Sequence, residues 1–399
     1  MDFVVVATAD WDNPLWTNKQ HLSSRWGRTG HRVLYVESLG LRRPGVSGRD
    51  LRRMWRRLSR AHRLRQVSTG VWVLSPLVIP VHDSARIRRI NRRILRRRVR
   101  SAVRRVGMRA PVLWTYNPLS LDYLGGTEWS ALIYHCVDEL AGAPGIPTEV
   151  VERSERELCG RADLVIVSAA GLASGAREEA RRLEYFPNVA DFDHFHQAAA
   201  GTLPTPADVA EIRRPRIGFV GSISDYKIDL DLLREIFEAH PDWSLVLVGP
   251  VGEGDPDTRA ESLASLHNVH FLGVRAYDAL PGYLASFDVC LLPNRINRYT
   301  RHMFPLKFFE YLATGRPVVM SPLPSLDEYR RFAYVADGGD AAGFASEVEK
   351  ALAESKDAPV KKARIEEARQ HDWGVQAERL ATLAAETVEA RRKPDEEHD

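Results

Sequence analysis

The chain has 399 residues, of which 44% are hydrophobic and 27% are charged, and its formal net charge is +3. This composition excludes a disordered chain, and the length predicts two domains, since one hydrophobic core rarely serves so many residues. No apolar run reaches the length of about 18 residues that indicates a membrane-spanning helix. Cys136, Cys159 and Cys290 are too few and too widely spaced for a disulfide framework or a metal site, which favours a reducing compartment.

The first elements form a β-α-β unit. Residues 3–8 predict a buried strand, followed by a polar, aromatic loop that contains Asp12, a helix over 17–28 and a second strand over 32–37. Such units build doubly wound parallel sheets, whose ligands bind beyond the carboxyl ends of the strands. The first residues lack the basic start and cleavage site of a signal peptide, so we expect a cytoplasmic protein.

A strongly basic stretch interrupts the pattern, with about twenty arginines between Arg42 and Arg109. Two amphipathic basic helices are predicted over 51–66 and 85–106, the first with Leu51, Trp55 and Leu58 on one face. A helix of this kind docks on an anionic membrane, or packs as an ordinary surface helix. Nucleic acid is disfavoured as a partner, because neither a nucleic-acid-binding motif nor an aromatic stacking platform is present.

The sheet resumes with strands over 111–116, 131–137 and 163–168 and a helix over 147–160. His135 and Asp138 fall at the carboxyl end of the 131–137 strand, where they become candidate catalytic residues together with Asp12. A structural role for His135 stays open. We take residues 1–195 as the first domain and the Ala-, Pro- and Gly-rich residues 196–214 as a linker.

A second α/β series predicts another doubly wound domain over 215–370. Its strands fall at 216–220, 244–248, 269–272 and 289–292, with helices near 229–240, 277–286 and 341–355. Gly221 and Ser222 follow the first of these strands, and Gly249 follows the second, so both turns allow a backbone to approach a phosphate closely. A plain turn is the alternative. A helix over 371–392 and a frayed tail over 393–399 complete the chain.

One stretch of the second series carries the most chemistry. Pro305 suits the first turn of a helix and Gly315 suits its end, and a short strand follows at 317–320. Lys307 and Glu310 share a face near the helix N-terminus, where a cation and a carboxylate could hold the diphosphate and the ribose of a nucleotide. A solvated salt bridge on an amphipathic helix is the alternative.

These stretches, taken together, resemble the GT-B glycosyltransferases, and within them the family-4-like enzymes (glycosyltransferase family 1, or group 1) of bacterial polysaccharide and glycolipid assembly. The resemblance covers nearly the whole chain in order. The residues that carry it are 9–12 and 30–33, 161–168, 186–195, 219–221, 271–275 and 304–319.

The resemblance implies roles for matching positions. Glu310 matches the second glutamate of the family's E-x7-E motif, which holds the nucleotide ribose, whereas the first glutamate is replaced by His302 at the donor-sugar position. Lys307 falls where a diphosphate is met, and Arg275 falls near the base-binding loop. The remaining donor-site candidates are Gly221, Ser222 and Lys227.

The implied fold is two Rossmann-like domains facing a cleft, with the C-terminal helix crossing back to the first domain. The implied reaction is transfer of a sugar, with retention, from a nucleotide-sugar to a glycan, lipid-linked or small-molecule acceptor, without metal or other cofactor. Two alternatives stay open: a non-catalytic sugar-nucleotide-binding paralogue, suggested by His302, and a UDP-sugar epimerase.

Overall fold

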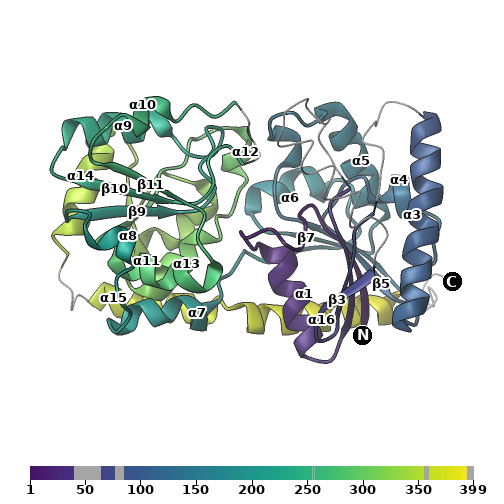
Figure 1. Ribbon diagram of the computed structural model, residues 1–399. Coiled ribbons are helices and arrows are strands. Elements are labelled where there is room, and N and C mark those ends of the chain that lie inside the picture. Colours follow the sequence, from purple (N-terminus) through teal and green to yellow (C-terminus); the bar gives the residue numbers. More distant parts are fainter. Residues whose placement is uncertain (40–63, 77–84, 254, 256, 355–358, 393–399) are drawn as a thin grey trace. The chain divides into compact units, whose positions relative to one another are not determined.

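The computed structural model describes residues 1–39, 64–76, 85–253, 255, 257–354 and 359–392 (Figure 1). The chain forms two compact units. Unit 1 comprises Met1–Pro187 together with Gln376–Asp399, and unit 2 comprises Asn188–Val375. Unit 1 is therefore built from both ends of the chain, with unit 2 inserted between them.

Unit 1 contains an eight-stranded sheet in the order β3-β4-β2-β1-β5-β6-β7-β8. All neighbouring strands pair in parallel except β3, which is antiparallel to β4. The strand order reverses between β1 and β5, and ligands of open parallel sheets bind beyond the carboxyl ends at such a reversal. The strands are β1 (Asp2–Val6), β2 (Arg32–Val36), β3 (Leu64–Ser68), β4 (Val71–Leu74), β5 (Val112–Thr115), β6 (Leu132–Cys136), β7 (Leu164–Val167) and β8 (Leu183–Tyr185).

Helices cover this sheet, and the last helix of the chain completes its core. Trp26 stacks on Phe3 at 4.1 Å between ring centroids, and the Trp26 indole N–H donates a hydrogen bond of 2.8 Å to the Ala377 carbonyl. Leu380 and Ala384 are also fully buried in this core. The helices of unit 1 are α1 (Asn18–Arg28), α3 (Ala85–Val106), α4 (Ser120–Leu124), α5 (Thr148–Arg161), α6 (Ala170–Arg177) and, from Gln376 on, α16 (Trp373–Arg392).

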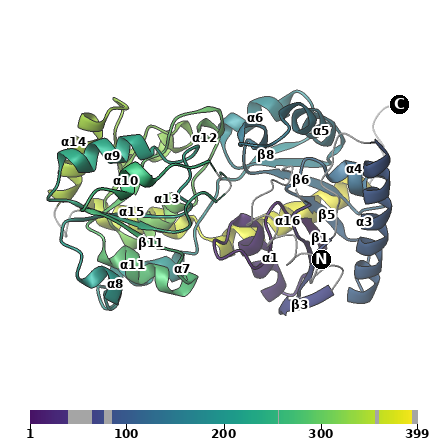
Figure 2. The same ribbon diagram turned by 45° about the horizontal axis from the view of Figure 1, so that its top comes forward.

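The structure tests only part of the prediction of two basic helices. Residues 51–63 of the first lie outside the described part of the chain, and residues 64–66 are not helical, because they begin strand β3. The second is confirmed as α3, which spans 22 residues. Leu95 and Val99 on one face of α3 are buried, whereas most of its arginines are exposed. Both views show α3 along the outside of unit 1 (Figure 1 and Figure 2).

Unit 2 contains a six-stranded parallel sheet in the order β11-β10-β9-β12-β13-β14. The order reverses between β9 and β12, so the loops that follow these two strands flank the expected binding position of this sheet. The strands are β9 (Arg216–Val220), β10 (Ser244–Val248), β11 (Val269–Gly273), β12 (Val289–Leu292), β13 (Val318–Met320) and β14 (Tyr334–Val335).

The helices of unit 2 pack on both faces of its sheet. Leu233, Ile236 and Phe237 of one helix and Phe344 and Val348 of another join the strands in one buried cluster. The helices are α7 (Phe192–His196), α8 (Ala207–Ala210), α9 (Leu230–Ala239), α10 (Glu261–Ala264), α11 (Leu280–Ser286), α12 (Arg298–Arg301), α13 (Lys307–Thr314), α14 (Ala341–Leu352) and α15 (Pro359–Gln370).

The segment predicted as a linker differs from that expectation. Residues 196–214 lie inside unit 2, where they contain a 3-10 turn and helix α8. Asp208 of α8 forms an ion pair with Arg275 at 2.7 Å, and the Arg216 guanidinium donates hydrogen bonds to the Ala210 and Ile212 carbonyls. Residues 196–214 are therefore part of the folded unit 2, where the side chains of Arg216 and Arg275 hold them in place.

Candidate functional site

Helix α13 places two charged side chains near the reversal point of the second sheet. Its apolar face is buried, with Phe308, Phe309 and Leu312 inaccessible to solvent, and Gly315 ends it in the left-handed conformation at φ +70°. Gly315 suits this position because a β-carbon would be strained there. The helix is therefore held on the sheet by its apolar side chains, which fixes the direction of Lys307 and Glu310 in its first turn.

Lys307 and Glu310 form a close, largely buried pair. The Lys307 ammonium donates a hydrogen bond of 2.7 Å to a Glu310 carboxylate oxygen, and the side chains are 19% and 4% exposed. Their spacing is that of an ordinary helix pair, but their burial is not, since charged side chains are seldom removed from water. The burial argues against the solvated salt bridge that the sequence left open.

The turns after β9 and β10 lie against one another. A β-carbon on Gly249 would come within 1.8 Å of the Gly221 carbonyl oxygen, and one on Gly221 would come within 3.7 Å of the Lys307 side chain. The Gly221 amide donates to the Val248 carbonyl at 2.9 Å. Only glycine permits this approach, so the Gly221 turn, the Gly249 turn and Lys307 form one group.

Ser222 and Lys227 belong to the same loop after β9. The Ser222 hydroxyl faces the Glu253 carbonyl at 3.3 Å, in the loop after β10. The Lys227 ammonium lies 5.2 Å from the ring centroids of both Tyr226 and Tyr299, and Tyr299 belongs to α12, in the loop after β12. The two loops at the reversal point are thus joined, and Lys227 lies at their junction.

His302 and Arg275, the two remaining donor-site candidates, are described by their own contacts. His302 directly follows α12 as its C-terminal cap and lies five positions before Lys307, in the chain segment that leads into α13. The Arg275 guanidinium donates hydrogen bonds to Asp208 at 2.7 Å and to the Tyr283 hydroxyl at 2.8 Å, and Asp208 raises the pKa of Arg275. For Arg275 to meet a nucleotide base, this pair would have to open.

A second polar group lies at the carboxyl edge of the first sheet. The Lys19 ammonium, in the first turn of α1, lies 3.9 Å from an Asp138 carboxylate oxygen and 5.5 Å from the centroid of the Tyr116 ring. The Tyr116 and His135 ring centroids are 5.0 Å apart. Tyr116 follows β5, His135 belongs to β6 and Asp138 follows it, so the group surrounds the ends of neighbouring strands beside the reversal point.

His135 is a neutral imidazole inside this group. Burial lowers its pKa to about 3, with a smaller effect from the Lys19 charge. Both ring nitrogens are inaccessible to solvent and have no hydrogen-bond partner within the described residues. Burial also raises the pKa of Tyr116, partly offset by the Trp114 indole, so its hydroxyl stays protonated at neutral pH.

Asp12 is engaged elsewhere in unit 1. Its carboxylate forms an ion pair of 2.7 Å with Arg65 on β3, and the two side chains are equally exposed. Arg65 also lies 3.9 Å from buried Glu37, at the end of β2. The structure therefore brings together His135 and Asp138 and gives Asp12 different partners.

Three residues of these groups escaped the sequence analysis. No role was assigned to Lys19 from the sequence, although its position directly after the first β-loop was a usable signal. None was assigned to Tyr116 either. Tyr311, which is fully buried in α13, has its hydroxyl 2.9 Å from the Val220 amide, a long-range contact with no sequence signal.

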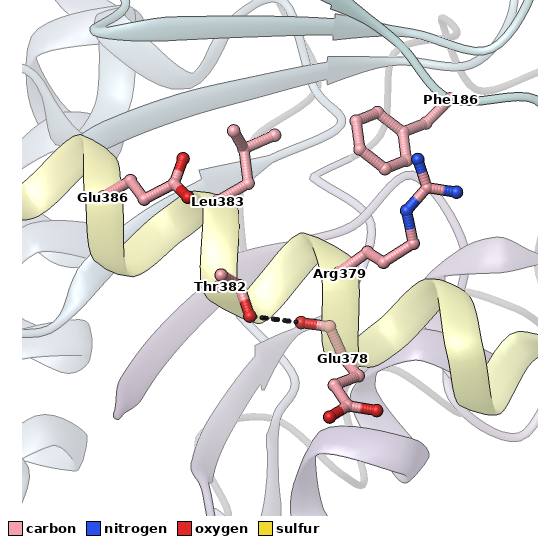
Figure 3. A pocket seen from close by; sticks show the side chains of 6 residues that line it. All are labelled: Phe186, Glu378, Arg379, Thr382, Leu383 and Glu386. Carbon is pink, nitrogen blue, oxygen red and sulfur yellow. Dashed lines mark hydrogen bonds between the residues drawn. The ribbon is translucent and has the colours of Figure 1, made fainter.

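A surface hollow of about 350 Å³ lies on α16, lined by the six residues labelled in Figure 3: Phe186, Glu378, Arg379, Thr382, Leu383 and Glu386. The Arg379 guanidinium lies 5.1 Å from the Phe186 ring centroid, and the Thr382 hydroxyl donates to the Glu378 carbonyl at 3.1 Å. None of the candidate site residues lines it. Across the described residues, no cluster of histidine, cysteine and carboxylate side chains could hold a metal ion, and no helix is long and apolar enough to cross a membrane.

Comparison with known proteins agrees with this division of the molecule. Residues 214–354 match the family model described as glycosyl transferases group 1. The putative teichuronic acid biosynthesis glycosyltransferase TuaH of Bacillus subtilis (strain 168) is 28% identical over 264 residues. That match spans 62% of this chain and 64% of the length of TuaH, which is less than two thirds of the relative.

Solved structures match over almost the entire chain. Sucrose-phosphate synthase from Thermosynechococcus elongatus has a TM-score of 0.70 at 16% identity, with 98% of this chain and 99% of that chain covered. HepE from Anabaena, in complex with UDP and glucose, has a TM-score of 0.66 at 16% identity, with 96% and 99% covered. At these identities the likeness shows the fold, which confirms the predicted class of two parallel-sheet, Rossmann-like α/β bodies of the GT-B type.

The resemblance suggested by the sequence is thereby confirmed for the fold and for the family of the second unit. The site of unit 2, with Lys307 and Glu310 beside the Gly221 turn, lies within the part of the chain that the family model covers. The chain carries a glycosyl transferases group 1 domain over residues 214–354, within a fold of the GT-B type.

Proposed function

We propose that the protein transfers a sugar from a nucleotide-sugar donor to a glycan, lipid-linked or small-molecule acceptor in cell-surface polysaccharide or glycolipid biosynthesis. The observation that carries the proposal is the buried Lys307–Glu310 pair beside the Gly221 and Gly249 turns. The UDP and glucose bound to HepE support the proposed donor class, and the similarity to TuaH, a putative teichuronic acid biosynthesis glycosyltransferase, supports the proposed pathway.

Each part of the donor has a proposed partner in unit 2. Glu310 accepts hydrogen bonds from the ribose hydroxyls, and Lys307 and the amides near Gly221 and Ser222 offset the charge that develops on the departing diphosphate. Lys227 flanks the diphosphate, Arg275 serves the base once its pair with Asp208 opens, and His302 faces the donor sugar. No metal is required, because the cation and the amides supply the positive charge.

The reaction we propose proceeds with retention. The acceptor hydroxyl attacks the anomeric carbon on the face from which the diphosphate leaves, the bond from that carbon to the diphosphate oxygen breaks, and the hydroxyl proton passes to the diphosphate or to a protein base. His135, Asp138 and Asp12 are the candidates for contacts to the reacting sugars. His135 suits a hydrogen bond to a sugar hydroxyl, since it stays neutral throughout the physiological pH range.

The test is a thermal-shift panel of UDP-, GDP-, ADP- and dTDP-sugars, followed by an assay of sugar transfer and donor hydrolysis. A ligand that binds the folded protein raises its melting temperature. We expect one nucleotide class to stabilise the wild type and not Glu310→Ala. A matched control is Glu347→Ala, which removes the acid of an i, i+3 pair with Lys350 on α14, a pair whose lysine is 59% exposed.

The outcomes separate the competing functions. Binding of a nucleotide-sugar with neither transfer nor hydrolysis would favour a non-catalytic paralogue, the alternative that His302 suggests. Conversion of a UDP-sugar to its epimer would favour an epimerase. No shift with any nucleotide-sugar would reject the donor site in unit 2.

We also propose that α3 docks on an anionic membrane surface, placing the protein at the cytoplasmic face of the cell membrane. The helix carries 11 arginines among its 22 residues and no acidic residue. Ile90 and Ile94 are 48% and 39% exposed beside them, which suits insertion of apolar side chains below anionic headgroups. The segment 51–63 was expected to contribute, but it lies outside the described residues.

Sedimentation with liposomes that contain phosphatidylglycerol, at low salt, tests this docking. We expect the wild type to sediment, and Ile90→Ser with Ile94→Ser to sediment less at unchanged net charge. Equal recovery in the supernatant with anionic and neutral liposomes would reject the proposal.

A further inference from the structure

Strand β8 leaves one edge of the unit 1 sheet open. Within the described chain it is the last strand on this side, and its one neighbour is β7, with which it pairs in parallel. Tyr185 at its end is 43% exposed, so the edge is accessible to another molecule. The backbone N–H and C=O groups along such an edge are a template for pairing with a further strand.

The hydrogen bonds of β8 show which of its backbone groups face outward. The Arg182 carbonyl and the Phe186 amide each form a hydrogen bond of 2.9 Å to β7. Every second residue of a strand bonds to the same side, so Glu184, which lies between these two, is also turned toward β7. The amide and the carbonyl of Leu183 therefore point to the open edge.

Charged side chains flank Leu183 symmetrically. Arg182 precedes it and Glu184 follows it, with 40% and 37% of their side chains exposed. Alternate residues of a strand point to the same face, and the Arg182 guanidinium lies 3.1 Å from a Glu184 carboxylate oxygen. The sequence Arg-Leu-Glu is thus its own complement in an antiparallel pair, because reversing it exchanges the two signs.

We propose that β8 is a dimerisation strand, which pairs antiparallel with β8 of a second copy of this chain about a two-fold axis at Leu183. The two leucines then lie opposite each other and exchange both of their backbone hydrogen bonds. Arg182 lies opposite the partner's Glu184, and Glu184 lies opposite the partner's Arg182. These are non-hydrogen-bonded positions, where side chains approach most closely across an antiparallel pair.

The charges also select this register. In an in-register parallel pair, or in an antiparallel pair displaced by two residues, Arg182 or Glu184 faces the same residue of the other copy. Like charges directly opposite each other destabilise a strand pair. Charges on an edge strand often prevent pairing, but charges of one sign do so in every register, whereas these alternating signs favour one.

Helix α16 provides a further carboxylate beside this edge. Glu386 lies 3.7 Å from the same Arg182 nitrogen that is 3.1 Å from Glu184, so two carboxylates share one guanidinium. In the dimer, the partner's Arg182 pairs with Glu184 and each carboxylate has its own guanidinium. The hollow of about 350 Å³, which extends from Phe186 to Glu386, leaves room for these side chains (Figure 3).

The test is the mass of the full chain in solution at low salt, measured by sedimentation velocity across a wide range of protein concentration. We expect a monomer–dimer equilibrium for the wild type. Arg182→Glu and Glu184→Arg each turn two attractive pairs into repulsive ones, so each should weaken the dimer about tenfold. Arg161→Glu is the matched control, because it makes the same change in an exposed pair with Glu157 on α5 and should leave the dimer unchanged.

An equimolar mixture of the two single variants separates pairing between chains from a role within one chain. Arg182→Glu presents two glutamates and Glu184→Arg presents two arginines, so each variant repels itself and complements the other. We expect the mixture to form dimers, although the ion pair within each chain stays broken. Loss of a merely structural pair would not be repaired by mixing.

Leu183→Pro tests the backbone contribution. Proline removes only the outward amide, and edge strands tolerate proline at such a position, so the melting temperature should be largely retained while the dimer is lost. Should this variant not fold, the charge variants and their mixture still decide.

The proposal is overturned if the wild type is a monomer at every concentration, if either charge variant dimerises as well as the wild type, or if their mixture stays monomeric. A dimer that survives in folded Leu183→Pro would also overturn it, since the copies would meet elsewhere. None of these variants changes a candidate donor-site residue, so the result is independent of nucleotide-sugar binding.

Discussion

The Tyr311 hydroxyl accepts a hydrogen bond of 2.9 Å from the Val220 amide, across 91 positions of the sequence. Tyr311 lies in α13, between the first turn that carries Lys307 and Glu310 and the end of the helix, and Val220 is the last residue of β9. One buried contact thus fixes the helix that carries the charged pair to the strand that leads into the Gly221 turn.

Tyr311→Phe is expected to destabilise the protein by about 1–3 kcal/mol, because the variant leaves a buried amide without a partner. Weaker binding of the nucleotide-sugar is also expected, since α13 would lose its tie to the turn. Urea denaturation and thermal shift measure the two effects. The control is Tyr185→Phe, an exposed position where a change within about 0.5 kcal/mol is expected.

Lys307→Met is expected to weaken nucleotide-sugar binding at least about tenfold, because a cation would no longer face the diphosphate. Titration calorimetry with the nucleotide-sugar identified by the panel measures the effect. Lys350→Met removes an exposed lysine from a pair of the same spacing and should leave the affinity unchanged. Equal affinity in the wild type and Lys307→Met would remove Lys307 from the site.

His135 should make the protein sensitive to acid. Its imidazole has a pKa of about 3 when folded, against 6.5 as its ordinary value, so the unfolded chain binds a proton that the folded chain refuses. Stability is therefore complete above pH 6.5 and decreases as the pH falls toward 3. Between pH 7.5 and pH 5 the loss from this group is about 2 kcal/mol.

His135→Phe, which suits the surrounding aromatic rings, should reduce that loss by the same amount. The measurement is the free energy of unfolding in urea at the two pH values for both proteins. Parallel pH profiles for the wild type and the variant would contradict the prediction, because they would show that the imidazole takes up its proton at the same pH in the folded and unfolded chains.

Glu155 should have the opposite effect on the pH dependence of stability from that of His135. Burial raises its pKa, and the Tyr134 hydroxyl and the Cys136 thiol, with its sulfur at 3.5 Å, lie against its carboxyl. Since the unfolded chain releases this proton near pH 4.5 and the folded chain retains it longer, the group costs stability as the pH rises from 4.5 through the folded pKa. Glu155→Gln cannot release a proton, so its stability relative to the wild type should increase from pH 4 to pH 7.

Gly249→Ala tests the contact between the two turns of unit 2. The new β-carbon would lie 1.8 Å from the Gly221 carbonyl oxygen, and the backbone at φ +145° would be strained with any side chain. We expect both a lower melting temperature and weaker nucleotide-sugar binding. Gly175→Ala is the control, because a β-carbon there meets nothing within 4 Å and the glycine lies in α6.

The periodicity of the sequence was enough to predict most of the fold. Strand and helix patterns located α3, α13 and most of the parallel strands of both sheets, because each of these elements buries a continuous apolar face. Strands β3 and β4 were missed within the arginine-rich region, and the short edge strands β8 and β14 were missed as well. Helix α15 was missed because its buried face is small, with Arg364 and Ala368 as its buried residues. Arg364 can be buried because it forms an ion pair of 2.6 Å with Glu354. No local sequence pattern reveals this pair.

The candidate sites were less predictable than the fold. Lys307 and Glu310 could be paired from their spacing alone, because three positions on a helix share a face. The hydrogen bond between Arg275 and Asp208 could not be predicted in this way, because 67 positions separate the two residues. The composition around Asp208 also indicated a linker. Lys19 was missed for the same reason, since its burial depends on strands that lie about a hundred positions away.

The hydrogen bond from Trp26 to Ala377 spans 351 positions, and this has a consequence for synthesis of the protein. The sheet of unit 1 leaves the ribosome early, but the helix that completes its core emerges only after the whole of unit 2. Unit 2 can fold as soon as its own residues have emerged, whereas the exposed apolar face of unit 1 must wait for α16. The nascent chain therefore carries an unfinished first unit throughout the synthesis of unit 2, and a premature stop before residue 376 would release it in that state.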